Sequence, residues 1–447
     1  MLTDSYNPFF YLKRRWTTGA SPIYTIIIVI VTHLLLSFDM SVAQAKYHGL
    51  DDYLKAALKQ NPLLVSSRLE ESAATYANDA IRKSYYPQIG INSQLIVAPS
   101  WGYDPAVTNG GQFGAQLSTS YILYNGGLKS LEMEKGNLGV QQGTAGLKKL
   151  QGDVLYNIAV AYTFAVKEKR ELAVLDENVE LLKDYFTLVT QLHAGGQASE
   201  NDVLKTSVRL NNAVIEASAK EASYRNALLD LSTGAGIPQV EVTGVDTSIT
   251  SSDIDTSFHA SKNIDLASAE LEKQNADFDA EISQTQSMPA ISLSADAGAL
   301  TSIPNLQRGL GNVFGASFGV SFTLPLIPYG YFDSQFKAAQ LKAESVSEQT
   351  TFLRMSLESE FAQARNDYVQ AKQQLNSLIA NLSTAHQDLF LSKAKYAGGS
   401  GSSIEVLDAI QSINDTKLSI EETRNVISVS EFKMRRLNYN GVDPNEW

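Results

Sequence analysis

The chain has no cysteine among its 447 residues, which excludes a lipid anchor on an N-terminal cysteine and favours an oxidising compartment. Its five histidines are scattered and match no metal-binding spacing. The phosphate-binding loop, the Gly-x-Ser-x-Gly nucleophile motif and the His-Glu-x-x-His zinc motif are all missing from the sequence. The sequence therefore predicts neither an enzyme nor a bound cofactor or metal.

Positive charge and long hydrophobic runs are also scarce. The formal net charge is −12, and without basic clusters beyond the first 45 residues this balance argues against nucleic-acid binding. The apolar run Ile26–Leu36 is shorter than the about 20 residues that a membrane-spanning helix needs. It follows the cationic residues Lys13–Arg15 and precedes Ala43-Gln44-Ala45, an order that predicts a secretory signal peptide. The alternative is an uncleaved membrane anchor.

The sequence does contain an internal tandem repeat of one structural unit. Ala194-Gly195-Gly196 is followed by Asp202-Val203-Leu204, and Ala397-Gly398-Gly399 is followed at the same spacing by Glu405-Val406-Leu407. Internal repetition of this kind decides the architecture before any other pattern does. Each unit is expected to run in the order helix, strand, strand, long helix, Gly-rich turn, helix.

The boundaries of the two units follow from composition. A stretch rich in Ser, Thr, Asp and Gly between Pro238 and Ser261 is typical of a linker. The predicted segments are the signal peptide (1–45), the first repeat (46–237), the linker (238–261), the second repeat (262–441) and a C-terminal tail (442–447).

Each repeat contains two segments in which apolar and small polar residues alternate. The expected strands are 88–98, 112–124, 290–300 and 313–325. In the last of these, Phe318 and Val320 lie on one face while Ser317 and Ser321 lie on the other. This pattern is typical of an outer-membrane strand, with lipid on one side and water on the other. A soluble hairpin packed on a core would show the same alternation.

Four strands cannot close a membrane barrel by themselves. A bilayer leaves no sheet edge unpaired, and bacterial single-chain barrels begin at about eight strands. If these strands span a membrane, several chains must therefore share one barrel.

The segments after the second strand of each repeat carry a heptad spacing typical of coiled-coil packing. In the first repeat the apolar positions are Leu172, Leu175, Val179, Leu182, Phe186 and Val189. A continuous helix from Leu128 to Leu192 would be roughly 100 Å long at 1.5 Å per residue, much longer than a usual globular helix. A heptad by itself is found in bundles far more often than in channels.

The order of these motifs resembles the TolC-like outer-membrane efflux proteins. The paired turn motifs carry the resemblance, together with the opening Leu50-x-x-Tyr53-Leu54, Tyr86-Pro87 and Tyr124-Asn125-Gly126-Gly127. It implies a homotrimer with a 12-strand β-barrel in the outer membrane of a Gram-negative bacterium and a barrel of coiled-coil helices in the periplasm.

The same resemblance implies an exit duct for efflux or type I secretion. Such a duct contacts outer-membrane lipid and works with a periplasmic adaptor protein and an inner-membrane transporter. The cargo, whether drug, metal ion or secreted protein, is not written in the sequence. The alternative is a soluble periplasmic coiled-coil scaffold or adaptor protein.

In that family acidic side chains line the periplasmic entrance, and the resemblance assigns this place to Glu405 and Asp408. Three residues apart, they are expected on one face of the helix that begins at Ser402. Threefold repetition would give two acidic rings that favour cations. However, Ser402 to Glu405 also fits a capping box, and Ser199–Asp202 fits a weaker one. Glu405 is therefore open between cap and ring, whereas Asp408 has no capping role.

A further expectation concerns the closed state of the tips. Tyr396 matches the position of a gate tyrosine, and it is expected to bond across to Asp202. The alternative for Tyr396 is ordinary packing at a helix end. A basic residue that can accompany this tyrosine would fall at Gly401, so no salt-bridge latch is expected there. The glycines predicted to form the hairpin-tip turns are Gly195, Gly196, Gly398, Gly399 and Gly401.

Overall fold

A computed structural model of the chain describes residues 49–97, 111–238, 244–247, 255–302 and 313–440. These all belong to one unit of the fold, Tyr47–Trp447. The predicted signal peptide (1–45) and tail (442–447) lie outside the described residues, as do parts of the predicted linker. Within the described ranges, none of the helices combines the length and apolarity that a bilayer crossing would need.

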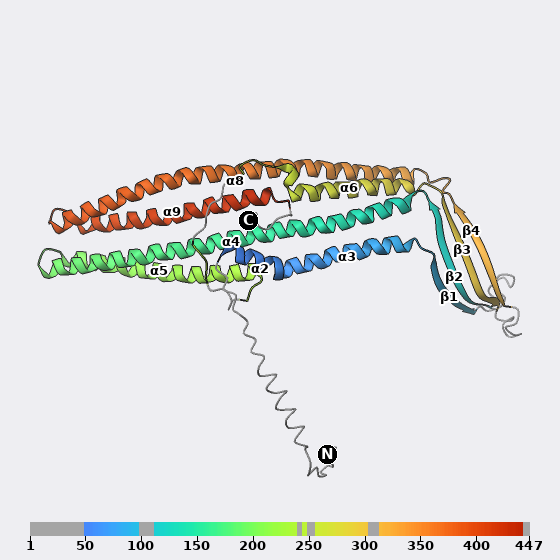
Figure 1. Cartoon of the computed structure of the whole chain (residues 1–447), viewed down its shortest axis with the longest axis horizontal. Coiled ribbons are helices and arrows are strands. Elements are labelled where there is room, and N and C mark those ends of the chain that lie inside the picture. The colour runs from blue at the N-terminus through green and yellow to red at the C-terminus, as the bar shows by residue number, and fades with distance from the viewer. Residues whose placement is uncertain (1–48, 98–110, 239–243, 248–254, 303–312, 441–447) are drawn as a thin grey trace, which may run out of the picture. The chain divides into compact units, whose positions relative to one another are not determined.

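The secondary structure follows one order twice, as the repeated motifs predict (Figure 1). The first half contains α2 (Leu50–Gln60), α3 (Pro62–Ser84), β1 (Gln88–Val97), β2 (Gly111–Asn125), α4 (Leu128–Ala194) and α5 (Glu200–Ala235). The second half contains the 3-10 turn η2 (Ala260–Lys262), α6 (Ile264–Thr285), β3 (Ala290–Ser302), β4 (Phe314–Thr323), α8 (Tyr331–Ala397) and α9 (Ser403–Leu437). The predicted fold class, mainly helical with two tandem repeats and four strands, is confirmed.

The four strands form a single antiparallel sheet in the order β1-β2-β3-β4. The central pair, β2 with β3, joins the two repeats. In the β3–β4 pair Phe318 lies opposite Ala295 and Val320 opposite Leu293, whereas Ser317 lies opposite Asp296. Apolar residues therefore share one face of this pair and polar residues share the other. The outer edges of β1 and β4 have no strand partner within the described chain.

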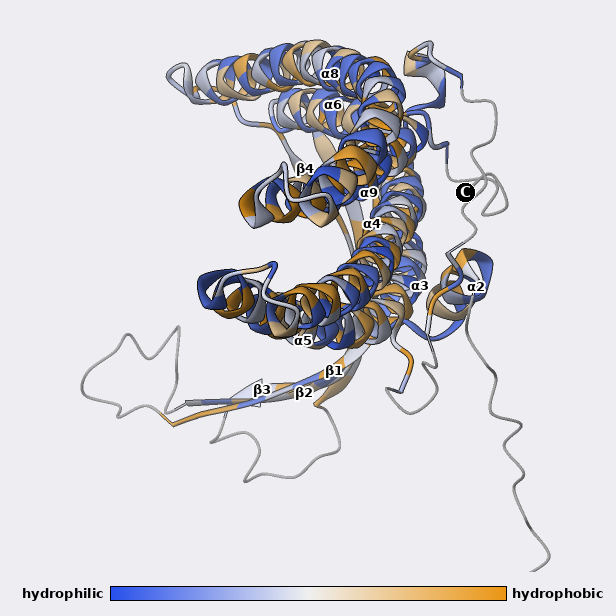
Figure 2. Ribbon diagram, turned by 90° about the vertical axis from the view of Figure 1, so that its left-hand side faces the viewer, coloured by the Kyte–Doolittle hydropathy of each residue, from blue (hydrophilic) through white to orange (hydrophobic). Residues whose placement is uncertain are grey.

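The helices stand side by side in a row. Toward the hairpin tips the order of neighbours is α5, α4, α9, α8, and toward the sheet it is α3, α4, α6, α8. The two 67-residue helices, α4 and α8, run through both levels, each roughly 100 Å long. Figure 2 shows this row curving, with α3 and α5 at one end and α8 at the other.

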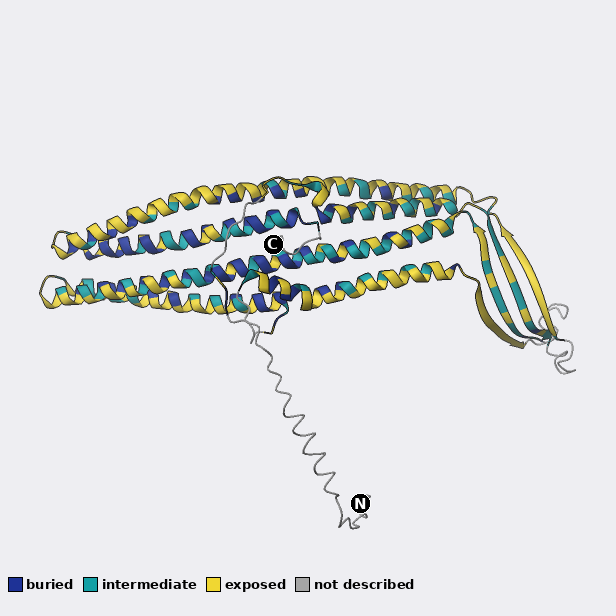
Figure 3. Ribbon diagram, viewed as in Figure 1, coloured by how far each residue is buried: buried dark blue, intermediate teal, exposed yellow. Residues whose placement is uncertain are grey.

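Apolar side chains at heptad spacing hold the helices together. In α8 the residues Leu357, Phe361, Ala364 and Tyr368, which are spaced four, three and four residues apart as in a heptad, are all buried. In α4 Tyr185 is fully buried where Phe186 was expected in the seam. The reason is that α4 packs against α5 on one side and α9 on the other, so it carries two interleaved seams. Buried residues follow these seams in Figure 3.

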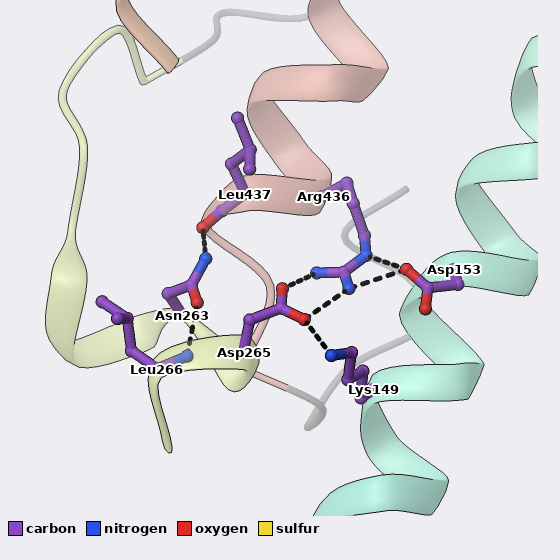
Figure 4. A network of polar contacts seen from close by, with 7 residues as sticks. All are labelled: Lys149, Asp153, Asn263, Asp265, Leu266, Arg436 and Leu437. Carbon is purple, nitrogen blue, oxygen red and sulfur yellow. Dashed lines mark hydrogen bonds and ion pairs between the residues drawn. The ribbon is translucent and has the colours of Figure 1, made fainter. Parts of the chain in front are cut away.

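The short helices of each repeat are joined end to end by an asparagine. Asn61 caps α3 by accepting from the Leu63 N–H at 2.8 Å, and its amide donates to the Gly234 carbonyl at the end of α5 at 2.8 Å. Asn263 caps α6 in the same way and donates to the Leu437 carbonyl at the end of α9 at 2.7 Å (Figure 4). In both repeats, therefore, one asparagine side chain caps the start of one helix and bonds to the end of the helix that lies before it in the row.

An ion-pair network around the buried Arg436 fixes the second of these junctions to α4. The Arg436 guanidinium, at the end of α9, pairs with Asp265 of α6 at 2.9 Å and with Asp153 of α4 at 2.7 Å (Figure 4). Lys149 of α4 pairs with Asp265 at 3.1 Å. Burial alone would raise the pKa of Asp265, but these cations, Arg436 first, hold it below its ordinary value. Three helices thus meet through one buried arginine.

Part of the predicted linker is bound to the helices rather than free. Four consecutive carbonyls, those of residues 244–247, each accept a hydrogen bond from a side chain. The donors are, in order, Tyr53, Lys169, Tyr162 and Arg170. The Val245 side chain is buried in the same place, with 2% of its surface exposed. We call residues 244–247 the strap.

Replacing the central arginine should destabilise the fold. Arg436→Leu removes the partner that Asp265 and Asp153 share, and losing one side of a fully buried pair costs about 3–5 kcal/mol. The cost should be smaller here, because Asp153 is 44% exposed and Asp265 keeps its pair with Lys149. We expect a lower midpoint of thermal helix loss by circular dichroism. Because the pKa of Asp265 is lowered by folding, the wild-type contribution is present above about pH 4 and is lost as the pH falls further.

The control is the exposed pair Lys83–Asp79, whose loss should leave the midpoint almost unchanged, because solvent screens exposed pairs. Equal midpoints for Arg436→Leu and Lys83→Leu would contradict a structural role for the network.

Candidate functional site

The two hairpin tips are built by the same glycine-dependent turn. Gly196 and Gly399 have φ of 74° and 76°, in the left-handed region that glycine adopts without steric cost. The chain then bonds back to the preceding helix, from Gln197 N–H to the Leu192 carbonyl at 2.8 Å and from Ser400 N–H to the Lys395 carbonyl at 2.9 Å. The predicted glycines therefore occupy equivalent turns, in which the second of each pair takes the special conformation.

The returning helices begin with different caps. Ser199 accepts from the Asp202 N–H at 3.2 Å, and the Asp202 carboxylate accepts from the Ser199 N–H at 3.3 Å, which completes a capping box. Ser402 accepts from the Glu405 N–H at 3.3 Å, but no bond returns to the Glu405 carboxylate within the described chain. The sequence suggested the stronger box at Ser402, so the expected ranking was wrong. The Ser199 hydroxyl also bonds Asp202 at 2.8 Å and fixes its shorter side chain.

The incomplete cap leaves Glu405 available. Glu405 and Asp408 are both exposed, on the face of α9 opposite the buried Val406 and Ile410. Asp408 also borders a groove of about 510 Å³ between α5 and α9. The other residues that line this groove are Leu204, Lys205, Val208, Arg209, Asn212, Ile404 and Leu407.

A tyrosine that the sequence did not single out joins the two hairpins. The Tyr185 hydroxyl of α4 donates to the Ser403 hydroxyl at 3.0 Å and lies 3.4 Å from the Ser403 carbonyl, at the start of α9. Its ring packs on Tyr396 of α8 with 5.9 Å between centroids. Tyr185 is 1% exposed, and burial raises its pKa to about 12. The phenol is therefore neutral and donates a hydrogen bond to Ser403. We call these three residues the tip clasp.

The expected hydrogen bond between Tyr396 and Asp202 is not formed within the described chain. The enclosed Tyr396 hydroxyl makes no hydrogen bond to Asp202 among the described residues, because the Asp202 carboxylate accepts from the Ser199 N–H and hydroxyl in the capping box. Burial, and then the nearby charge of Asp202, raise the pKa of Tyr396. The ring of Tyr396 packs on Tyr185 near the end of α8, and the role of Tyr396 as a gate contact stays a prediction.

The turn at Gly401 leaves no room for the basic side chain that a salt-bridge latch would need there. A Cβ at this position would lie 2.9 Å from the Lys395 Cβ and 3.0 Å from the Tyr396 nitrogen, so a larger residue requires the turn to shift. The tips present carboxylates but no cluster suited to a cation: among the described residues, no three His, Cys, Asp or Glu side chains converge as a metal site.

Comparison with known proteins identifies the family. A family model described as outer membrane efflux protein matches residues 53–236 and 259–437. The chain is 21% identical over 420 residues to the outer membrane protein TolC of Salmonella enteritidis, covering 91% of this chain and 84% of TolC.

Two solved structures share the fold at low identity. The outer membrane protein VceC of Vibrio cholerae superimposes with a TM-score of 0.77 at 15% identity, covering 88% of this chain and 97% of VceC. The Campylobacter jejuni CmeC outer membrane channel gives a TM-score of 0.77 at 16% identity, covering 88% and 86%. With both repeats matched over most of its length, the chain belongs to the outer membrane efflux protein family and is an outer-membrane channel of Gram-negative bacteria, not a soluble periplasmic scaffold.

Proposed function

We propose that three copies of this chain close one exit duct, with a 12-strand barrel in the outer membrane and a ring of helices below it. The observation that carries this proposal is the four-strand sheet with two open edges. In a bilayer the unpaired N–H and C=O groups of β1 and β4 need partners, and a neighbouring copy offers the complementary edge.

The two ends of the helix row support the same assembly. Large apolar side chains are exposed along both, which is unusual for a monomer that ends in water. Those on α8 include Phe352, Met355 and Phe390, and those on α3 and α5 include Leu69, Tyr76 and Ile215. Figure 3 shows exposed residues along these helices. In a closed ring the α8 end of one copy would cover the α3 and α5 end of the next.

The chain has no motif for nucleotide binding or other energy conversion, so transport requires partners. We propose that a periplasmic adaptor and an inner-membrane transporter supply cargo and energy, for efflux or type I secretion. The groove between α5 and α9 supports adaptor contact at the tips, because Leu204, Val208 and Ile404 give it an apolar lining.

We propose that Glu405 and Asp408 form the acidic entrance to this duct. Three copies would bring six carboxylates around one axis, and like charges at close range repel. The tips must therefore be held together by other contacts. The tip clasp supplies one, because Tyr185 connects the first hairpin to the start of the helix that carries both carboxylates.

The assembly is tested by mass in mild detergent. The purified protein should sediment as a trimer and should fractionate with outer membranes. A monodisperse monomer that still forms pores after reconstitution would contradict the shared barrel.

Removing the Asp408 carboxylate should change ion selectivity without unfolding the tip, because Asp408 caps nothing. We expect Asp408→Ala to weaken block by a trivalent cation and to lower cation preference in planar-bilayer recordings. Asp230→Ala, an exposed change on α5 far from the tip, serves as the control and should leave both quantities unchanged. If Asp408→Ala behaves like this control, the acidic entrance is not built from Asp408.

Weakening the tip clasp should favour opening. Tyr185→Phe keeps the buried ring but removes a hydrogen bond, a loss of about 0.5–1.5 kcal/mol, so open-state conductance events should become several-fold more frequent. Tyr53→Phe removes a similar bond, to the strap, and should lower stability comparably while leaving conductance unchanged. Equal conductance in wild type and Tyr185→Phe would show that the clasp does not restrain the tips.

A further inference from the structure

The four described strands contain one charged side chain. Asp296 lies in the middle of β3, a strand of 13 residues, whereas β1, β2 and β4 consist of uncharged residues. An ionisable side chain inside a membrane is costly unless it faces water or the protein interior, and such residues are commonly functional. The position of Asp296 therefore points to a function rather than to packing.

Asp296 lies on the polar face of the sheet. Its partners directly across the neighbouring strands are Ser118 of β2 and Ser317 of β4. Residues directly opposite each other share a face, so Asp296 points away from the face that carries Phe318 and Val320. Because the outside of an outer-membrane barrel is apolar, the face with Asp296 is the one that lines the lumen. Both neighbours of β3 belong to the same chain, so a second copy does not cover this residue.

The Asp296 carboxylate has no cationic partner among the described residues. The Ser317 hydroxyl donates to it at 3.4 Å, which is long for a hydrogen bond between oxygens. The next residues on the same face of β3 are Ser294 and Gly298, which are small and uncharged. The charge of Asp296 is therefore directed at the water of the lumen.

We propose that Asp296 forms, once in each copy, a ring of three carboxylates inside the barrel that favours cationic over anionic cargo. This proposal rests on the trimeric duct proposed above, and it adds a selectivity position that is separate from the tips. Acidic rings make channels prefer cations, and residues that face the lumen of outer-membrane barrels set their selectivity.

The lumen is narrow enough for this ring to act on an ion near its axis. Strands about 4.8 Å apart and tilted by about 40° give a 12-strand barrel a radius of roughly 12 Å. The aspartate side chain reaches a few ångströms inward from that wall. The axis is therefore within about one Debye length of each carboxylate, since this length is about 10 Å at 0.1 M salt. In 1 M salt it falls to about 3 Å, and the preference for cations should be largely lost.

The absence of cysteine allows the charge at this position to be exchanged in the assembled channel. Full-length Asp296→Cys is reconstituted in planar bilayers and treated with a methanethiosulfonate reagent that carries either a sulfonate or a quaternary ammonium group. The cation-to-anion permeability ratio is obtained from the reversal potential in a gradient of dilute KCl. Asp408 is intact in every variant, so the tips contribute equally to all of these measurements.

The sulfonate should keep the ratio close to that of the wild type, and the ammonium group should lower it several-fold. Equal ratios with the two reagents would overturn the proposal. A thiol that reacts with neither reagent, as judged by mass, would show that residue 296 does not face water, which also overturns it. A wild-type protein that forms no pores would overturn the shared barrel and the ring together, whereas wild-type pores with equal ratios would overturn the ring alone.

A second variant removes the charge and keeps the size of the side chain. Asp296→Asn should lower the permeability ratio several-fold in dilute salt and should match the wild type in concentrated salt, where the charge is screened. Ser294→Asn places a side chain of the same kind on the same face without changing the charge, and it should keep the wild-type ratio in both. Equal ratios for these two variants in dilute salt would show that Asp296 does not set selectivity.

Discussion

A sheet that crosses a bilayer must satisfy the hydrogen bonds of both its edges, and the rest of this chain is arranged around that requirement. In the described part of the chain there are four strands, and the outer edges of β1 and β4 have no strand partner there. The row of helices is open at the same two ends as the sheet. One end is formed by α3, which is connected to β1, and the other by α8, which is connected to β4. One neighbouring copy could therefore cover both the open edge of the sheet and the open end of the helix row.

Below the sheet, the structural problem is to keep four helices abreast at two levels while only α4 and α8 are continuous. The breaks occur where α5 gives way to α3 and where α9 gives way to α6. Asn61 and Asn263 satisfy the helix ends at these breaks with matching bonds. At the break between α9 and α6, Arg436 adds ion pairs to Asp153 of α4 and Asp265 of α6. These ion pairs attach the second repeat to α4, in addition to the asparagine bonds that both repeats share.

The repeats, the four strands and the length of α4 could be predicted because each rests on a local period in the sequence. The tip contacts could not. Tyr185 falls outside the one heptad that the sequence predicts for α4. The helix in fact carries two sets of buried positions, one facing α5 and the other facing α9. The caps at Ser199 and Ser402 were ranked in the wrong order, because pattern alone does not say which carboxylate turns back. The roles of Glu405 and Asp408 remain predictions from motif position, and the structure adds that both carboxylates are exposed.

The strap shows how the two repeats can stay in register while the segment between them changes. Four side chains hold residues 244–247 by their carbonyl oxygens, which every amino acid has, and only Val245 contributes a buried side chain. Recognition of this kind specifies the path of the backbone, while the sequence is restricted chiefly at Gly244, whose φ of 144° favours glycine, and at the buried Val245. The join between the duplicated halves can thus change in sequence over evolution, as long as Gly244, a small apolar residue at position 245 and the donors on α2 and α4 persist.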